Sequence, residues 1–315
     1  MKKLILIFFI ASVSQVYSQA CCTAGSPLLS SLETSTTQKG NLQIGLSYVY
    51  NLLDDVYEET NYLNDNTRNR ISQSILMQAD YGVSENFSLS GLFTYINQER
   101  NISAYQGATN TVSASGIGDA LLLIKYNLVP LTILKEQELS FGLGTKIPLG
   151  KSDLTSNGLL LPADMQPGTG SWDFILWSYY SQGRLFELPL NLVINFSYRQ
   201  NGTNERFGNN NGSYKFGNEL ITQLGFGYRT DLPIDFTLLT RMRITGKDHF
   251  LENPIPNTGG NWLYLVPGIN IKVYRSIVFR LTSEIPIYRN LNGTQLTTTF
   301  TTAASIYYTI NNFNI

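Results

Sequence analysis

Charged residues are scarce in this chain of 315 residues: Asp, Glu, Lys and Arg make up 14% of it, against roughly 25% in an ordinary soluble domain. The 22 basic and 23 acidic residues leave a formal net charge of −1. Nucleic-acid binders present a strongly basic face, so this balance predicts no nucleic-acid partner. Beyond the first two dozen residues, no apolar run reaches the ~18 residues of a spanning helix. A soluble β-rich protein or a β-barrel membrane protein remains.

Cysteine and histidine are also nearly absent. The two cysteines, Cys21 and Cys22, are adjacent and cannot form disulfides that would stabilise a fold of this size. Neighbouring thiols can bind a soft metal such as copper(I), but no nearby His or Cys completes a site. We therefore expect no metal and no cofactor, with Cys21 and Cys22 as weak candidate ligands. The single histidine, His249, follows Asp248 in a long loop without a G-x-S-x-G motif, so we expect no enzyme.

The first 18 residues have the features of a secretory signal peptide. Two lysines precede an apolar stretch from Leu4 to Val13, and small residues follow it. Cleavage after Ser18 and cleavage after Ala20 both fit. We expect residues 19–39 to form a periplasmic N-terminal segment and residues 40–315 to form one domain.

Alternation with a period of two dominates that domain, as in strands with one apolar face. In the stretch 41–50, Leu42, Ile44, Leu46, Tyr48 and Tyr50 share one face. Each such segment is near or above the ~9 to 11 residues of a tilted membrane strand. The alternation predicts twelve strands, at 40–53, 69–82, 86–97, 114–128, 138–147, 171–182, 188–200, 214–230, 235–246, 261–273, 276–288 and 295–310.

The connections alternate in length. Those after even-numbered strands are mostly short, and those after odd-numbered strands are mostly long and rich in Asn, Gly, Thr and Asp. An even strand count with this alternation is typical of an outer-membrane barrel with periplasmic turns and extracellular loops. The sequence therefore predicts an all-β protein, a single antiparallel transmembrane β-barrel in the cell outer membrane.

Aromatic residues on the predicted lipid face form two belts, as expected at the two bilayer interfaces. The outer belt contains Tyr48, Tyr50, Phe93, Tyr95, Phe196, Tyr198, Phe216 and Phe300. The periplasmic belt contains Tyr81, Phe87, Tyr126, Phe226, Tyr228, Phe236 and Tyr308.

Charged residues on the other face would line the lumen. They could select solutes, with Arg199, Arg241 and Arg243 favouring anions, or they could pair with one another and fill the barrel. Lys146 with Asp173 and Glu219 with Arg241 are candidate pairs. The candidate lumen residues are Asp119, Lys125, Lys146, Asp173, Arg199, Glu219, Arg241, Arg243, Arg280 and Glu284, with Asp80, Arg229 and Lys272 on the same face.

Three consecutive motifs resemble one known family. They are GIGDALLLIKYNL at 116–128, ELSFGLGTKIPLGK at 138–151 and QPGTGSWDFILWSYY at 166–180. This order is similar to the outer-membrane family named for the MetA pathway of phenol degradation, which is distantly similar to fatty-acid transporters. The resemblance implies a barrel channel or transporter for hydrophobic or aromatic compounds. It marks Asp119, Lys151 and Asp173 as candidates for structural or gating roles.

We expect a channel that passes small solutes passively. The apolar stretch of loop 148–170 favours folding of this loop into the mouth, where Leu159, Leu160 and Leu161 would form the entrance contact. The expected partners are outer-membrane lipid, lipopolysaccharide, a small-molecule solute and the barrel assembly machinery. A filled-lumen structural or adhesion barrel is the alternative, and a lipid hydrolase using His249 is a more distant one.

Overall fold

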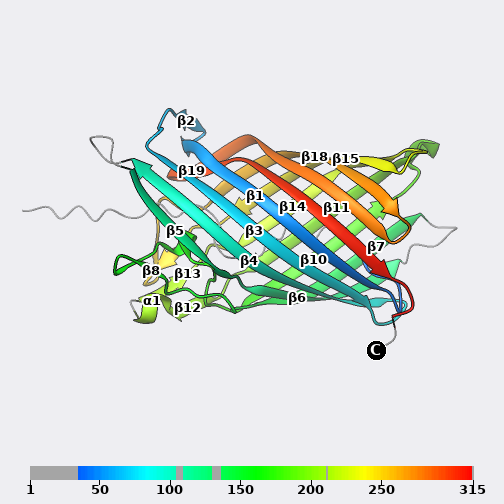
Figure 1. Cartoon of the computed structure of the whole chain (residues 1–315), viewed down its shortest axis with the longest axis horizontal. Helices are drawn as coiled ribbons and strands as arrows, with labels where there is room; N and C mark the ends of the chain where they lie inside the picture. Colours follow the sequence, from blue (N-terminus) through cyan, green and yellow to red (C-terminus); the bar gives the residue numbers. More distant parts are fainter. Residues whose placement is uncertain (1–34, 104–108, 130–135, 211, 314–315) are drawn as a thin grey trace, which may run out of the picture.

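The computed structural model describes residues 35–103, 109–129, 136–210 and 212–313, and its strands close into one antiparallel barrel (Figure 1). Neighbouring strands along the barrel wall are also neighbours in the sequence, apart from the closing pair. The barrel strands, in wall order, are β1 (Leu42–Glu59), β3 (Arg68–Gly82), β4 (Phe87–Ser103), β6 (Ala120–Val129), β7 (Gln137–Ile147), β10 (Asp173–Gln182), β11 (Leu190–Gln200), β14 (Glu219–Arg229), β15 (Ile234–Thr245), β18 (Gly260–Tyr274) and β19 (Ile277–Ile310).

β19 forms two passes of the wall. Its first half pairs with β18, with Leu291 opposite Gly260, and its second half pairs with β1, with Ile310 opposite Leu42. The chain reverses near Gly293, whose φ of 65° suits glycine in a tight turn. The eleven labelled strands therefore cross the wall twelve times, because β19 crosses it twice. This confirms the predicted number of crossings.

Two predicted strands are interrupted. The stretch 114–128 divides into β5 (Thr109–Ile117), which pairs only with β4, and β6, which pairs with both β4 and β7. The stretch 214–230 divides because β13 (Gly212–Lys215) joins a separate sheet, while β14 begins at Glu219. Extracellular loops contact the chain at both breaks: Asp119 accepts from the Thr169 backbone N–H, and the Gly217 backbone N–H donates to Asp248.

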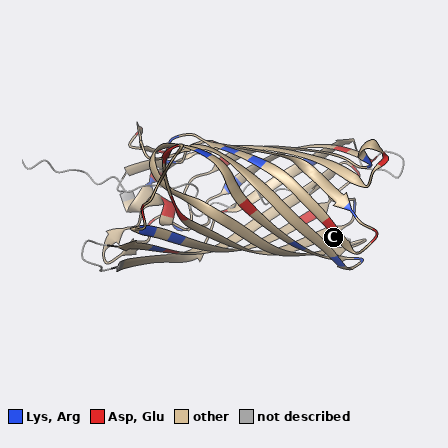
Figure 2. Ribbon diagram, turned by 90° about the horizontal axis from the view of Figure 1, so that it is seen from above, with Lys and Arg blue, Asp and Glu red and all other residues tan. Residues whose placement is uncertain are grey.

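Side chains alternate between the two sides of the wall, as expected for a barrel. Outward-facing apolar residues such as Leu46, Ile124, Leu143 and Leu238 are exposed, and Figure 2 shows that most of the wall carries no charge. Most aromatic residues of the two predicted belts are exposed, but Phe216 is wrongly assigned because it is buried among extracellular loop residues. A closed barrel with an apolar exterior satisfies every backbone group within lipid, so this is an outer-membrane β-barrel.

The connections differ at the two ends of the barrel. The turns at 83–86, 183–189, 230–233 and 275–276 are short, although η3 (Leu185–Glu187) lies within one of them. The other end carries β2 (Asn61–Leu63) and longer loops. These loops hold β8 (Thr155–Ser156), β9 (Leu159–Leu160), η2 (Ala163–Met165), and a sheet of β12 (Thr203–Arg206), β13, β16 (His249–Phe250) and β17 (Asn253–Pro254), with α1 (Phe207–Asn210) between β12 and β13.

No helix among the described residues is both long enough and apolar enough to cross a membrane.

Candidate functional site

The inward-facing side chains of the barrel are arranged in layers. Asp119 lies just before β6, at the extracellular end of this strand. Leu121 and Leu123 follow along β6, and Lys125 comes next, nearer the periplasm. Because alternate residues of a strand share a face, one strand contributes to three layers. An outer charged layer, a largely apolar middle layer and an inner polar layer follow one another.

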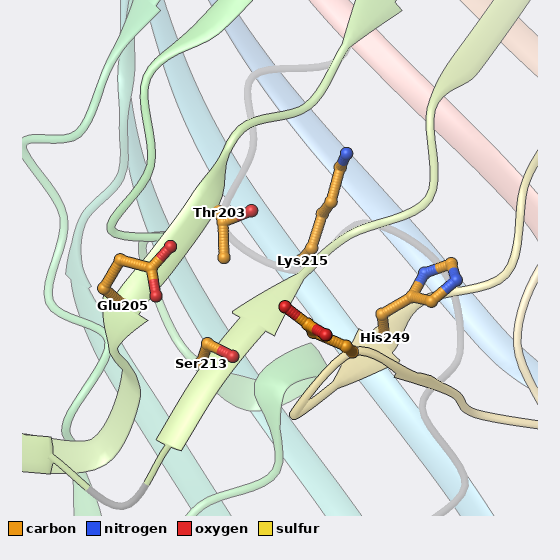
Figure 3. Close-up of a pocket in the computed structure, with 6 residues that line it drawn as sticks. Thr203, Glu205, Ser213, Lys215 and His249 are labelled. Carbon is orange, nitrogen blue, oxygen red and sulfur yellow. The ribbon is translucent and has the colours of Figure 1, made fainter.

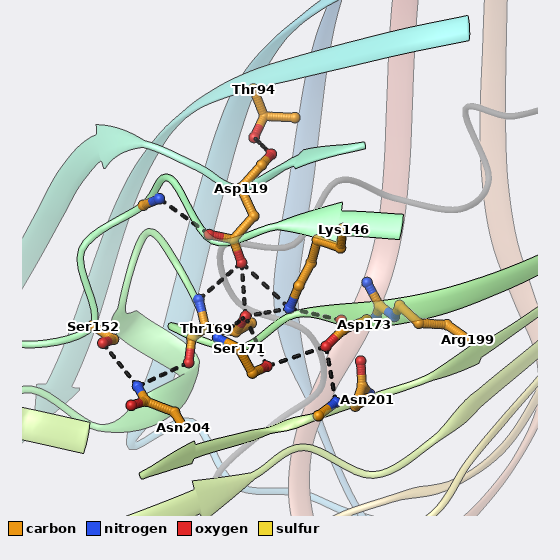
Figure 4. Close-up of polar contacts among 12 residues, drawn as sticks. Thr94, Asp119, Lys146, Ser152, Thr169, Ser171, Asp173, Arg199, Asn201 and Asn204 are labelled. Carbon is orange, nitrogen blue, oxygen red and sulfur yellow. Dashed lines mark hydrogen bonds and ion pairs between the residues drawn. The ribbon is translucent and has the colours of Figure 1, made fainter. Parts of the chain in front are cut away.

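The outer charged layer is centred on Lys146. Its Nζ lies 2.7 Å from the Asp173 carboxylate and 3.3 Å from the Asp119 carboxylate, and all three residues are buried (Figure 4). Lys146 and Asp173 are direct cross-strand neighbours on β7 and β10. The predicted contact between these two residues is therefore present, with Asp119 as a second carboxylate.

Asp119 lies where the predicted strand is interrupted. Its carboxylate accepts hydrogen bonds from the Gly150 backbone N–H at 3.1 Å and from the Thr169 backbone N–H at 3.0 Å, as well as the Thr169 hydroxyl at 2.7 Å. Asp119 thereby connects the barrel wall to loop 148–170. Charge-assisted bonds of this kind are roughly twice as strong as neutral ones, which is a physical reason for the break at Gly118 and Asp119.

A second group of ions continues this layer. The Glu219 carboxylate lies 2.7 Å from both Arg199 and Arg243. Arg241 forms an ion pair with Glu284. The contact that the sequence suggested between Glu219 and Arg241 stays a prediction. The outer arginines face carboxylates, and their preference for anions also stays a prediction.

The middle layer faces inward. On β11 it is polar, with Ser197 directly opposite Trp177, and on β1, β3, β4, β6, β10 and β14 it contains an apolar cluster. This is a continuous cluster in which Trp177 contributes the largest side chain, and Tyr179 stacks on that indole with the rings 6.0 Å apart. Gly142 on β7 lies opposite Trp177, and a Cβ at that glycine would come within 3.0 Å of the indole. The buried members are Val49, Leu76, Leu92, Leu121, Leu123, Ile175, Trp177 and Ile221.

The inner layer is polar and includes part of the N-terminal segment. Lys125 Nζ lies 3.4 Å from the Asp80 carboxylate and 4.9 Å from the centre of the Trp177 ring. It also donates to the Ser35 carbonyl at 3.3 Å. The Thr36 hydroxyl donates to Glu138 at 2.8 Å. We expected residues 19–39 in the periplasm, yet Ser35 and Thr36 contact lumen-facing side chains.

Loop 148–170 is attached to the barrel by Asp164. The Asp164 carboxylate lies 2.8 Å from Arg70 on β3 and 3.9 Å from Arg100 on β4, and all three residues are buried. Arg70 also donates to the Asp164 carbonyl at 3.1 Å. These ion pairs hold the loop against the inward face of two strands.

The three leucines of the predicted entrance contact are separated. Leu161 packs with Ala114 and Met165. Leu160 packs against a different cluster, which contains Phe207, while Leu159 is 75% exposed. Arg280, another predicted lumen residue, donates to Asn270 at 2.7 Å, and its guanidinium lies 5.5 Å from the centre of the Tyr307 ring.

Asp248 joins two extracellular loops. Its carboxylate accepts hydrogen bonds from the Tyr214 hydroxyl at 2.7 Å and from the Gly217 backbone N–H at 2.8 Å. The pKa of the Asp248 carboxyl is raised from 3.8 to about 6. Burial is the largest cause and the nearby Asp164 adds to it, while the two hydrogen bonds and His249 partly oppose the rise. Burial and the charge of Asp248 raise the pKa of Tyr214.

This raised pKa predicts that the extracellular sheet is more stable in mild acid. The folded state binds the proton of Asp248 more tightly than the unfolded state, so the stabilisation is complete below pH 3.8 and is lost as the pH rises through about 6. Limited proteolysis of loop 246–259 should be slower at pH 5 than at pH 7.5. In Asp248→Asn, which cannot ionise, this difference should vanish, and an unchanged difference would contradict the prediction.

Several residues at these sites were not among the predicted ones. Asp164, Arg70 and Arg100 form the loop attachment, and Thr169 completes the Lys146 cluster. The only sequence signal for Asp164 is an acidic residue directly after an apolar loop stretch. Cys21 and Cys22, the signal peptide and its cleavage sites lie outside the described residues.

No family model and no curated protein matches the sequence, so the resemblance to the MetA-pathway family stays a prediction. Among solved structures, the COG4313 outer membrane channel from Pseudomonas putida F1 has a TM-score of 0.69 at 14% identity, over 87% of this chain and 97% of that one. The NanC porin has a TM-score of 0.45 at 10% identity, over 85% of this chain and 98% of that one. The CymD monoaromatic hydrocarbon channel has a TM-score of 0.41 at 12% identity, over 88% of this chain and 90% of that one.

At these identities the similarity concerns the fold alone, and the two scores below 0.5 add nothing to it. Together with the closed wall and its apolar exterior, the first similarity establishes the architecture. The chain folds as an outer-membrane β-barrel similar to the COG4313 channel.

Proposed function

We propose that this protein is an outer-membrane channel for the passive passage of small apolar solutes, aromatic ones included. The observation that carries this proposal is the inward-facing apolar layer, in which Leu121, Leu123, Ile175 and Trp177 are buried. An apolar or aromatic solute loses contact with water when it enters such a layer, which favours its entry by roughly 25 cal/mol per Å² of buried apolar surface.

The charged layers support the same proposal. The predicted selectivity residues Lys146 and Arg199 are paired with carboxylates, so their fields are largely neutralised locally. A hydrated ion that passed them would next meet the apolar layer, where losing water is costly. The apolar side chains of loop 148–170 that contact β5, Leu161 and Met165, extend the apolar surface toward the mouth.

Passage then continues into the inner layer, where a solute meets Lys125, Glu138 and the end of the N-terminal segment at Ser35 and Thr36. The proposal includes the remaining expected partners. Lipid and lipopolysaccharide would cover the apolar exterior, and the barrel assembly machinery would insert the chain.

The test follows entry of a fluorescent apolar amine, N-phenyl-1-naphthylamine, into cells with an intact lipopolysaccharide layer. Expression of the protein should speed entry of the probe, and Ile175→Thr combined with Ile221→Thr should slow it several-fold because hydroxyls interrupt the apolar layer. The matched control is Leu176→Thr, because Leu176 is the next residue on β10 and is exposed on the outer face. Equal entry with and without the protein would overturn the proposal.

A filled-lumen scaffold is the second candidate, and the buried ion pairs favour it, because small barrels are stabilised by such filling. Single-channel recording distinguishes the two functions further. Stable ion steps that depend on Arg199, Arg241 and Arg243 would indicate a selective pore for ions. Absence of both ion steps and probe entry in a folded barrel would indicate the scaffold.

A further inference from the structure

A cavity lies outside the lumen layers, on the extracellular sheet of β12, β13, β16 and β17. It has a volume of about 320 Å³, which is at the lower end of the range for small-molecule sites. Figure 3 shows side chains from different strands around the same space. The lining residues are Thr203, Glu205, Ser213, Lys215, His249 and Glu252.

The two faces of this sheet have different environments. Asn204 and Tyr214 point to the face that packs on the barrel loops: Asn204 donates to the Thr169 carbonyl at 3.0 Å, and Tyr214 is buried among apolar residues. Their sequence neighbours Thr203, Glu205, Ser213 and Lys215 point to the opposite face because side chains alternate along a strand. The cavity is therefore formed on the face directed away from loop 148–170.

The charged groups around this cavity are not paired with one another. Glu205, Lys215, His249 and Glu252 make no ion pair and no side-chain hydrogen bond with any other described residue. Glu205 and Glu252 are exposed and Lys215 is half-buried, so groups of both signs are accessible to a ligand. Lys215 can bind a carboxylate as a charge-assisted donor, and Glu205 and Glu252 can accept from an ammonium group.

The position of Glu252 is held by a tight turn. Leu251 and Glu252 have φ values of 49° and 66°, and they form the two-residue connection between Phe250 and Asn253. Asn and Gly are the usual residues of such a turn. Below the sheet, Asp248 bonds to Tyr214 and to the Gly217 backbone, which keeps β13 and β16 together. These contacts fix the backbone from which the lining side chains extend.

We propose that this cavity is a cell-surface binding site for a small zwitterion of the amino-acid type. In this site Lys215 holds the ligand carboxylate, Glu205 and Glu252 hold its ammonium group, and the hydroxyls of Thr203 and Ser213 complete the polar contacts. A metal ion is a poorer occupant, because no group of three or more His, Cys, Asp or Glu residues in the described part of the chain is arranged to hold one. The site is independent of the lumen and of the proposed passage of apolar solutes.

The test is calorimetric titration of the full-length, detergent-folded protein with glutamine as the probe. Two analogues each remove one charge: N-acetylglutamine lacks the ammonium group and glutamine methyl ester lacks the carboxylate. Both should bind about tenfold or more weakly than glutamine, since each loses a charge-assisted contact.

Variants locate the site. Lys215→Gln and Glu205→Gln should each weaken glutamine binding by about tenfold or more. The matched controls, Lys247→Gln and Glu58→Gln, alter exposed charges that do not line the cavity and should leave the affinity within about twofold. Heat-modifiable migration on gels confirms that each variant is folded. No glutamine binding, equal binding of the three probes, or equal affinities in all four variants would overturn the proposal, as would binding of zinc in place of glutamine.

Discussion

Replacement of Lys146 with methionine is expected to lower the free energy of unfolding by about 3–5 kcal/mol, the usual cost of removing one partner from a buried ion pair. Lys146 is fully buried between Asp119 and Asp173. Asp119 keeps hydrogen bonds from Gly150 and Thr169. The Asp173 oxygen that faces Lys146 accepts no hydrogen bond from another described residue. Methionine at position 146 would therefore leave this buried oxygen without its ion-pair partner.

The measurement is denaturant unfolding in detergent, followed by tryptophan fluorescence. Lys146→Met with Asp173→Asn should recover part of the loss, because the second substitution removes the uncompensated charge. Lys272→Met is the matched control: Lys272 pairs with Asp235 at 2.7 Å, but its side chain is 50% exposed, so the loss should stay within about 1 kcal/mol. Equal unfolding midpoints for Lys146→Met and Lys272→Met would show that the Lys146 cluster contributes no more than a surface pair.

Asp164→Asn is expected to release loop 148–170 from the barrel wall and to speed entry of the apolar probe. The Asp164 carboxylate faces Arg70 and Arg100, and the substitution removes the negative charge that both guanidinium groups meet. A hydrogen bond between charged groups contributes about 1.5–3 kcal/mol, and each 1.4 kcal/mol is a tenfold change in an equilibrium. The population of the released loop should therefore rise by roughly ten- to a hundredfold.

Entry of N-phenyl-1-naphthylamine into cells that express each variant measures this change as a rate. Asp153→Asn is the control, because Asp153 lies on the same loop and carries the same charge but forms no ion pair with another described residue. If both variants behave as the unmodified protein does, Asp164 does not hold the loop closed. If both open the channel, the loss of any negative charge from the loop is sufficient, and the buried contact has no special role.

Local sequence patterns determined the barrel wall to a large extent. Period-two alternation placed all twelve crossings, and the alternating connection lengths placed the loops and turns at opposite ends. Both signals are local, because a strand must present one face to lipid and the other to the lumen. The cross-strand pair of Lys146 and Asp173 could also be predicted from the sequence, since each residue lies near the end of a strand and both strands adjoin the same loop.

Only the tertiary structure decided what the loops and the lumen contain. Asp119 interrupts a predicted strand because loop 148–170 returns to it with backbone donors, and Phe216 is buried because extracellular segments pack around it. The attachment of Asp164 to Arg70 joins residues 94 positions apart in the chain. Contacts of this kind depend on how a loop folds back over a closed wall, and neither strand periodicity nor loop length specifies that path.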